Sequence, residues 1–347
     1  MIGRIRAVVV GWVILASAAH AAEPTRFELT EPHMGVPFKL VFYAGERGHA
    51  NKAARAAFDR IEQLNSRLSD YDPQSELTEL SRTAGSGKTV ALSDDLWTVL
   101  AAAQRLAEQS EGAFDVTVGP YVRLWRRARR TGEMPRAEYL RSAAEAVGYG
   151  HLKLDPESHT ARLTQQEMRL DLGGIAKGYA ADEALAVLRE HGIESALVDA
   201  SGDIAAGDPP PGRAGWRIGI APLEQDAAPS RYLELANMAV ATSGDTWQYV
   251  EIDRKRYSHI VDPKSGLGLT RRSSVTIIAP DGMTADSLAS AVSVLGPERG
   301  IALVEATERA EALLHWREDD ELRTAQSSGF DAYLSGKTPA DAASPQQ

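Results

Sequence analysis

The order of its apolar segments is the feature that most constrains the fold of this chain. Short apolar runs typical of buried strands, such as residues 38–43 and 274–279, are interspersed with amphipathic segments of helical period, such as residues 51–68 and 93–110. The two kinds of segment follow no regular strand–helix–strand rhythm, and there is no internal repeat. This order favours an α+β fold, with mixed sheets and packed helices in a single compact unit, over a doubly wound sheet.

Local signals place further elements along the chain. Ser75 and Ser93 stand where helix N-caps are expected. Residues 168–172 are predicted to form a strand and residues 175–190 the helix that follows it. The basic run at 126–130 is interpreted as a solvated helix face rather than a ligand site. Residues 331–347 are small, polar and Pro-containing, which predicts a disordered tail.

The first 21 residues have the pattern of a secretory signal peptide. Arg4 and Arg6 precede the apolar run 7–19, and the A-x-A sequence at 19–21 marks a cleavage site. An uncleaved membrane anchor is the alternative, since the run is only slightly short for a span. Cleavage predicts an exported, periplasmic protein whose single domain covers residues 22–330.

Composition excludes several classes of function. The formal net charge is −10, and no basic stripe interleaved with aromatic residues is present, so nucleic-acid binding is not expected. The chain has no cysteine, which removes disulfides, thiolate nucleophiles and zinc–thiolate sites. A polyanionic ligand must therefore be held locally, by a metal ion, a lysine or a helix N-terminus.

The strongest local motif is the segment 171–178 (DLGGIAKG), between a predicted strand and a predicted helix. Gly173 and Gly174 allow the backbone to approach a ligand closely, and the helix N-terminus offers free N–H groups to an anion. Lys177 adds a positive charge, and Asp171 can accept a hydrogen bond from a heterocycle or a sugar. The alternative is a tight turn with a surface lysine, and the octapeptide alone does not decide between them.

Three weaker motifs follow the same logic. Residues 112–120 (GAFDVTVGP) place an aromatic ring beside a carboxylate, although a helix–helix connection with a core Phe is the better explanation of this segment taken alone. Residues 241–245 (ATSGD) and 257–266 (YSHIVDPKSG) surround His259, which is either a general base, a phosphate positioner or a structural residue. In residues 284–290 (TADSLAS), Asp286 and Ser290 share one helix face, as oxygen ligands of Mg²⁺ could, or the segment merely caps a helix.

Taken together, these blocks resemble the ApbE family of FAD:protein FMN transferases. Residues 68–77 (LSDYDPQSEL), 112–120, 170–178, 201–204, 242–266 and 285–290 match the family's motifs in order, and the resemblance covers about residues 34–330. It implies an α+β fold, FAD as substrate, Mg²⁺ as cofactor, and transfer of FMN to a Ser or Thr hydroxyl of an acceptor protein with release of AMP.

The resemblance also implies roles for individual residues. The FAD site is expected to be lined by Met34, Tyr71, Ala113, Phe114, Asp115, Asp171, Lys177 and Ile260. The metal is expected on the Gly174 carbonyl, Asp286 and Ser290. His259 is the candidate base or phosphate positioner.

Three positions depart from the family pattern: Val116 for Pro, Ser201 for Gly and Ser290 for Thr. Serine keeps the hydroxyl oxygen, so metal binding is expected to survive. The chain lacks an acceptor motif of the Asp-x-x-Ser/Thr-Gly-Ala-Thr type, which predicts modification of another protein. Two alternatives stay open, an FAD pyrophosphatase of the same fold and a non-enzymatic flavin carrier or maturation partner of a periplasmic redox complex.

Overall fold

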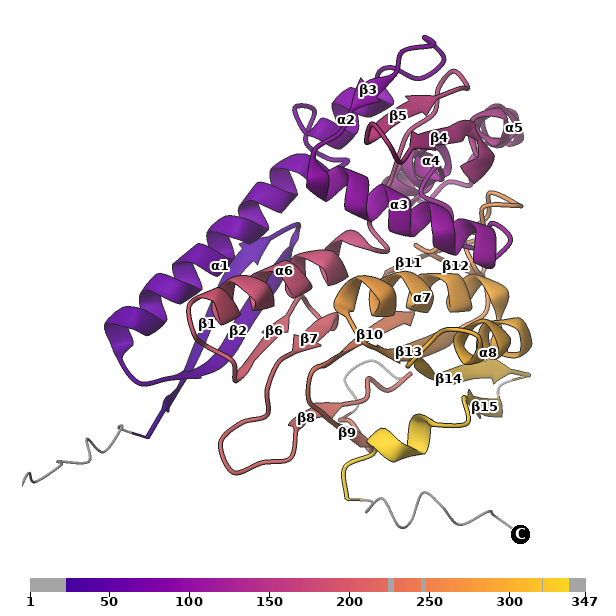
Figure 1. Cartoon of the computed structure of the whole chain (residues 1–347). Helices are drawn as coiled ribbons and strands as arrows, with labels where there is room; N and C mark the ends of the chain where they lie inside the picture. Colours follow the sequence, from indigo (N-terminus) through magenta and orange to yellow (C-terminus); the bar gives the residue numbers. More distant parts are fainter. Residues whose placement is uncertain (1–22, 224–227, 245–247, 320, 337–347) are drawn as a thin grey trace, which may run out of the picture.

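The computed structural model describes residues 23–223, 228–244, 248–319 and 321–336. The centre of this part of the chain is an eight-stranded sheet in the order β1-β2-β6-β7-β10-β13-β14-β15, with antiparallel pairing between all neighbours (Figure 1). Its strands are β1 (Thr25–His33), β2 (Val36–Ala44), β6 (Ala196–Asp199), β7 (Ile204–Ala206), β10 (Met238–Gly244), β13 (Ser273–Ala279), β14 (Glu311–Glu318) and β15 (Glu321–Gln326).

Four helices cover one face of this sheet (Figure 1). They are α1 (Arg47–Leu68), α6 (Ala176–Glu190), α7 (Gly282–Leu295) and α8 (Pro297–Glu305). Successive side chains of a strand point to opposite faces of the sheet, so β2 contributes to both. Phe38, Leu40 and Phe42 pack under the helices, and Val41 points to the other face. There it packs with the ribbon of β8 (Trp216–Gly219) and β9 (Tyr232–Leu235).

A second group of elements lies at the end of α1, above the N-terminus of α6 in Figure 1. The small sheet β3-β5-β4 and the hairpin β11–β12 join four helices there. The elements are α2 (Glu76–Ser81), β3 (Val90–Ala91), α3 (Asp94–Gln109), α4 (Gly119–Thr131), α5 (Ala137–Ala146), the 3-10 helix η1 (Tyr149–His151), β4 (Leu152–Asp155), β5 (Thr160–Leu163), β11 (Tyr249–Ile252) and β12 (Lys255–Ser258). This group supplies the second wall of the candidate site.

The structure confirms the α+β class and most of the local predictions. The side chains of Ser75 and Ser93 accept hydrogen bonds from backbone N–H groups of α2 and α3, as N-caps do. The strand predicted at 168–172 is wrong, because only Arg169 forms a bridge, parallel to Val118, before the chain turns at Gly173. The edge strand β1 was missed, since its residues are mostly exposed and polar.

The predicted disordered tail begins later than expected. Phe330–Tyr333 form the 3-10 helix η2, Phe330 is buried, and the Ser335 N–H donates to the Tyr232 carbonyl of β9. The prediction of disorder was therefore wrong for residues 331–336. Residues 337–347, the predicted signal peptide at 1–21 and Asp245 lie outside the described residues. No helix within the described ranges is long and apolar enough to cross a membrane.

Candidate functional site

The glycine turn at 173–174 and helix α7, far apart in the sequence, meet in space. A Cβ atom placed on Gly174 would lie 2.6 Å from Ser290 Oγ and 3.5 Å from the ring of Phe114. Only glycine fits there, because a methyl group would displace the hydroxyl. The turn therefore brings the backbone of residue 174 directly against the Asp286–Ser290 face of α7, with the Phe114 loop beside it.

A second close approach fixes Asp286. A Cβ atom on Gly178 would lie 2.0 Å from the Gly282 carbonyl oxygen, so α6 and α7 touch through their backbones. At this contact the Gly178 N–H donates to Asp286 Oδ2 over 3.1 Å. The Asp182 carboxylate of α6 accepts from the N–H groups of Gly282 and Met283, at 2.7 and 2.9 Å, and so satisfies two free donors at the start of α7.

Asp203 and Asp286 are buried, and their charges and that of Lys177 influence one another. Burial and the nearby Asp203 carboxylate raise the pKa of Asp286 to about 7, against the opposing charge of Lys177. Burial alone would lower the pKa of Lys177, but Asp286 and Asp203 outweigh it and hold that pKa above its ordinary value. Lys177 also forms an ion pair with Asp203. The cluster thus holds two carboxylates around one ammonium group, an excess of negative charge that a cation would relieve.

The oxygen atoms near the contact of the Gly174 turn with α7 are of the kind that bind a hard cation. Asp286 has a carboxylate and Ser290 a hydroxyl, and the backbone of Gly174, which meets Ser290, has a carbonyl group. The hydroxyls of Ser287 and Ser293 in the same helix donate to carbonyls one turn earlier, whereas the Ser290 hydroxyl makes no hydrogen bond within the described part of the chain. No group of three or more His, Cys, Asp or Glu side chains in that part is placed to hold a metal. A site with one carboxylate suits Mg²⁺, which leaves much of its shell to water and substrate phosphates.

Arg126 of α4 organises the next part of the site. Its guanidinium pairs with Asp70, donates to Asp171 over 2.9 Å, and lies 4.0 Å from the ring centroid of Tyr71. Tyr71 is 74% exposed, so the guanidinium covers one face of the ring and the other is free. Burial and the neighbouring Asp70 raise the pKa of Asp171, and Arg126 opposes that shift. The sequence-based assignment of Arg126 to a solvated face was wrong.

His259 lies at the end of β12 with one ring nitrogen engaged. Its Nδ1 is 3.1 Å from the Gln248 carbonyl oxygen, which can only accept, so Nδ1 carries the proton and Nε2 keeps its lone pair. Burial and the positive charges of Arg129 and Lys177 lower the pKa of His259 to about 4, although the Gln248 carbonyl opposes the shift. The ring is therefore neutral at pH 7 and faces two cations.

The remaining predicted residues support these groups. Asp115 is buried, which raises its pKa, and its Oδ1 accepts from the N–H and hydroxyl of Thr117, so it shapes the loop that carries Ala113 and Phe114. Met34 lies in the turn between β1 and β2 with φ of +49° and packs on the main core. Ile260 follows His259 in the chain, and its N–H donates to Ser258 Oγ.

Two functional residues were missed by sequence reasoning alone. Asp203 stands in a recognised glycine–aspartate turn but received no role, and Asp182 belongs to no motif. Only the tertiary structure reveals that Asp203, in the turn between β6 and β7, partners Lys177, and that Asp182 of α6 partners the start of α7.

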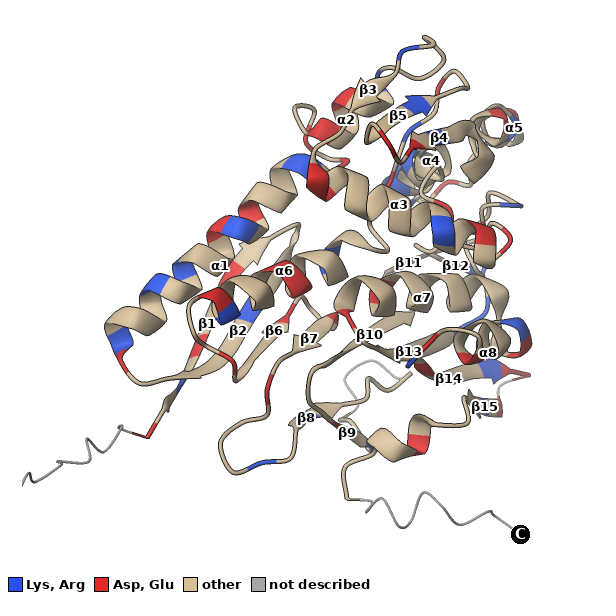
Figure 2. Ribbon diagram, in the orientation of Figure 1, with Lys and Arg blue, Asp and Glu red and all other residues tan. Residues whose placement is uncertain are grey.

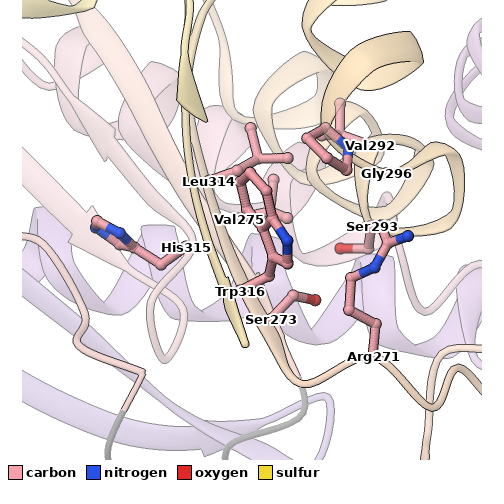
Figure 3. Close-up of a pocket in the computed structure, with 10 residues that line it drawn as sticks. Arg271, Ser273, Val275, Val292, Ser293, Gly296, Leu314, His315 and Trp316 are labelled. Carbon is pink, nitrogen blue, oxygen red and sulfur yellow. The ribbon is translucent and has the colours of Figure 1, made fainter. Parts of the chain in front are cut away.

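Two hollows lie apart from this group. One of about 10 Å³, room for about one water, is bordered by Arg271, Ser293 and Trp316 between β13, β14 and α7 (Figure 3). The other, of about 460 Å³, opens at the start of α7 between Asp182, Asp281 and Arg189. Neither is lined by Gly174, Ser290 or His259. The candidate site is therefore identified from its residues and not from a cavity.

Comparisons with known proteins agree with this architecture. The ApbE family model matches residues 34–314. A protein named FAD:protein FMN transferase from Vibrio cholerae is 34% identical over 328 residues, covering 93% of this chain and 96% of that protein. One of the same name from Haemophilus influenzae is 30% identical over 327 residues, with coverages of 91% and 94%.

Solved structures show the same similarity. The flavin transferase ApbE from Vibrio cholerae superposes with a TM-score of 0.81 at 32% identity, covering 90% of this chain and 100% of that one. The ApbE protein from Thermotoga maritima gives 0.80 at 28% identity, with coverages of 89% and 99%. Fold and site together define an enzyme of the flavin transferase class. The chain belongs to the ApbE family.

Proposed function

We propose that this chain transfers FMN from FAD to a Ser or Thr hydroxyl of an exported acceptor protein, in a Mg²⁺-dependent reaction that releases AMP. The observation that carries the proposal is that Gly174 meets Ser290 and Gly178 meets Asp286, on one face of α7. The signal sequence predicted at residues 1–21 supports export, and the net negative charge of the chain leaves the recognition of a dinucleotide to this local arrangement.

The reaction is a displacement at the FMN phosphorus. The acceptor oxygen forms a bond to that phosphorus, the bond from phosphorus to the AMP oxygen breaks, and the hydroxyl proton leaves. His259 takes that proton at Nε2, the nitrogen that the Gln248 hydrogen bond leaves free. A diphosphate beside the ring raises the pKa of His259 from its low resting value, since an anion favours the imidazolium form.

Other residues of the chain orient the substrate. The ammonium of Lys177 faces the diphosphate, while Asp203 holds Lys177 in place. Tyr71 and Phe114 offer ring faces to the flavin or the adenine, and Asp171, held by Arg126, accepts from a ring N–H or a sugar hydroxyl. The metal would sit on Asp286, Ser290 and the Gly174 carbonyl, where it neutralises charge that develops on the phosphoryl oxygens.

The decisive experiment measures where the FMN goes. The full chain is incubated with FAD and Mg²⁺, with and without a recombinant domain that carries the Asp-x-x-Ser/Thr-Gly-Ala-Thr motif. Mass spectrometry is expected to find FMN bound to the motif hydroxyl, with one AMP released for each FMN attached. The same domain with the acceptor residue changed to Ala is the control. Rapid release of free FMN without an acceptor would show a pyrophosphatase instead, and retention of intact FAD would show a carrier.

A further inference from the structure

Helix α4 carries five arginines and no acidic residue, in a chain of formal net charge −10 (Figure 2). At 100° per residue the arginines occupy an arc of about 160° around the helix. The opposite side of the helix is buried through Tyr121, Trp125 and Ala128. The arginines of the arc are Arg123, Arg126, Arg127, Arg129 and Arg130.

The arc has an inner and an outer part. The inner part belongs to the site, because Arg126 contacts Asp171 and Tyr71, and the charge of Arg129 acts on His259. The outer part consists of Arg123, Arg127 and Arg130, which are exposed. Within the described ranges, none of these three forms an ion pair. We call these three residues the outer arginine face.

The stability of the helix does not explain this face. Arg123 and Arg127 are four residues apart, and Arg127 and Arg130 three apart, so like charges lie side by side and destabilise the helix. The helix dipole favours Arg130 in the last turn, but it gives no support to Arg123 in the first half. A cluster that the fold does not neutralise is available to an external negative charge.

We propose that the outer arginine face docks an acidic segment of the acceptor protein and guides its hydroxyl to His259. This inference rests on the proposed transfer of FMN and names the chemistry of its partner. The face continues into Arg126 and Arg129, so a segment lying along α4 reaches Tyr71 and His259 without leaving positive surface. Tyr249 on β11, which packs on α4, is 38% exposed, and exposed Tyr and Arg together are typical of binding hot spots.

Binding of two matched peptides tests the proposal without relying on turnover. Both fluorescent peptides carry the same central Asp-x-x-Ser-Gly-Ala-Thr sequence, one with Glu-rich flanks and one with Gln-rich flanks. Anisotropy with the full chain is expected to show the acidic peptide binding about tenfold more tightly at low salt, with the advantage lost at high salt. The triple variant Arg123→Gln, Arg127→Gln, Arg130→Gln is expected to bind both peptides equally weakly.

A matched control removes the same charge elsewhere. Arg82, Arg162 and Arg213 are exposed and lie outside α4. Their triple change to Gln is expected to keep the preference for the acidic peptide. Equal binding of both peptides to the unmodified chain, or an undiminished preference in the α4 variant, would overturn the proposal. Loss of the preference in the control variant as well would overturn it in favour of a general charge effect.

Two further measurements separate this proposal from others. If the α4 variant loses binding to phosphatidylglycerol vesicles but keeps the acidic peptide, the face is a membrane surface and the proposal fails. The α4 variant is expected to bind FAD like the unmodified chain, since its three residues lie outside the FAD site. Preferential binding of the acidic peptide without FMN attachment or AMP release would retain the docking surface and refute the transferase.

Discussion

The contact of α6 with α7 and the side of the site formed by α4 differ in how tightly their residues are packed. At the contact, the backbones of α6 and α7 touch at Gly178 and Gly282, and Asp203 and Asp286 are buried. Lys177, whose side chain is 27% exposed, pairs with Asp203. On the α4 side, Tyr71 is 74% exposed and is held by a single guanidinium.

The difference teaches where precision is required. Stabilising charge on a phosphoryl group needs groups that do not move, and Lys177 and Asp286 lie in packed helices. Accepting a flavin and then a protein needs open surface. We therefore expect changes at the α6–α7 contact to cost more than changes on the α4 side.

Asp286→Asn tests the contact most severely. Asparagine keeps an acceptor for the Gly178 N–H but removes the carboxylate, so Mg²⁺-dependent turnover is expected to fall about 10³-fold, or about 4 kcal/mol. Because the pKa of Asp286 is raised by burial, its ionised form destabilises the metal-free fold. The melting temperature at pH 8 without Mg²⁺ is therefore expected to rise. Near-normal turnover in this variant would refute the metal assignment.

Gly178→Ala is expected to separate the two helices. The added Cβ meets the Gly282 carbonyl oxygen at 2.0 Å, and backbone atoms cannot swing aside. A loss of about 3 kcal/mol in the free energy of unfolding is expected in denaturant titrations. The matched control is Gly48→Ala in α1, where a Cβ meets nothing within 4 Å and alanine favours the helix. Equal stability of the two variants would mean that the contact is looser than described.

His259→Gln addresses the proton transfer. Turnover is expected to fall about 10²-fold while the dissociation constant for FAD changes little, because glutamine keeps polarity but accepts no proton at neutral pH. Stopped-flow measurement of AMP release, beside FAD titration, separates the two quantities. Parallel losses in both would make His259 a binding residue.

The same residue predicts a pH dependence of stability. The pKa of His259 is lowered to about 4 in the folded state, against about 6.5 in the unfolded chain. Its contribution is fully present above pH 6.5 and is lost as the pH falls towards 4. Between pH 7.5 and 4.5 the unmodified chain is expected to lose roughly 1–2 kcal/mol more unfolding free energy than His259→Gln. Identical pH profiles would contradict a ring that stays neutral in the folded state.

Arg126→Gln probes the open side and is expected to have the smallest effect. Without the guanidinium, Asp171 and Tyr71 lose their common partner, and the KM for FAD is expected to rise about fivefold, or about 1 kcal/mol. Arg127→Gln, on the exposed side of the same helix, is the control for charge alone. If Arg126→Gln lowered activity as much as Asp286→Asn does, the proposed difference between the α4 side and the α6–α7 contact would be wrong.

Much of the fold was accessible from the sequence because its signals are local. The N-caps at Ser75 and Ser93, the helical period of 51–68 and the apolar strands each depend on neighbouring residues only. Errors arose where distant contacts decide. The edge strand β1 has little apolar patterning, and residues 331–336 are ordered by contacts with β9 and the core beneath it.

The motifs of the site could likewise be read as residue types in order, and they sufficed to recognise the family. What the sequence by itself determined was the set of chemical groups: a glycine turn, a lysine, an acid–hydroxyl pair and a histidine. The tertiary structure alone decided that Gly174 meets Ser290, that Asp203 and Asp182 join the cluster, and that Arg126 faces inward. The physical reason is that these contacts span roughly 25 to 120 residues, and only the packing of helices on the sheet brings such groups within hydrogen-bond distance.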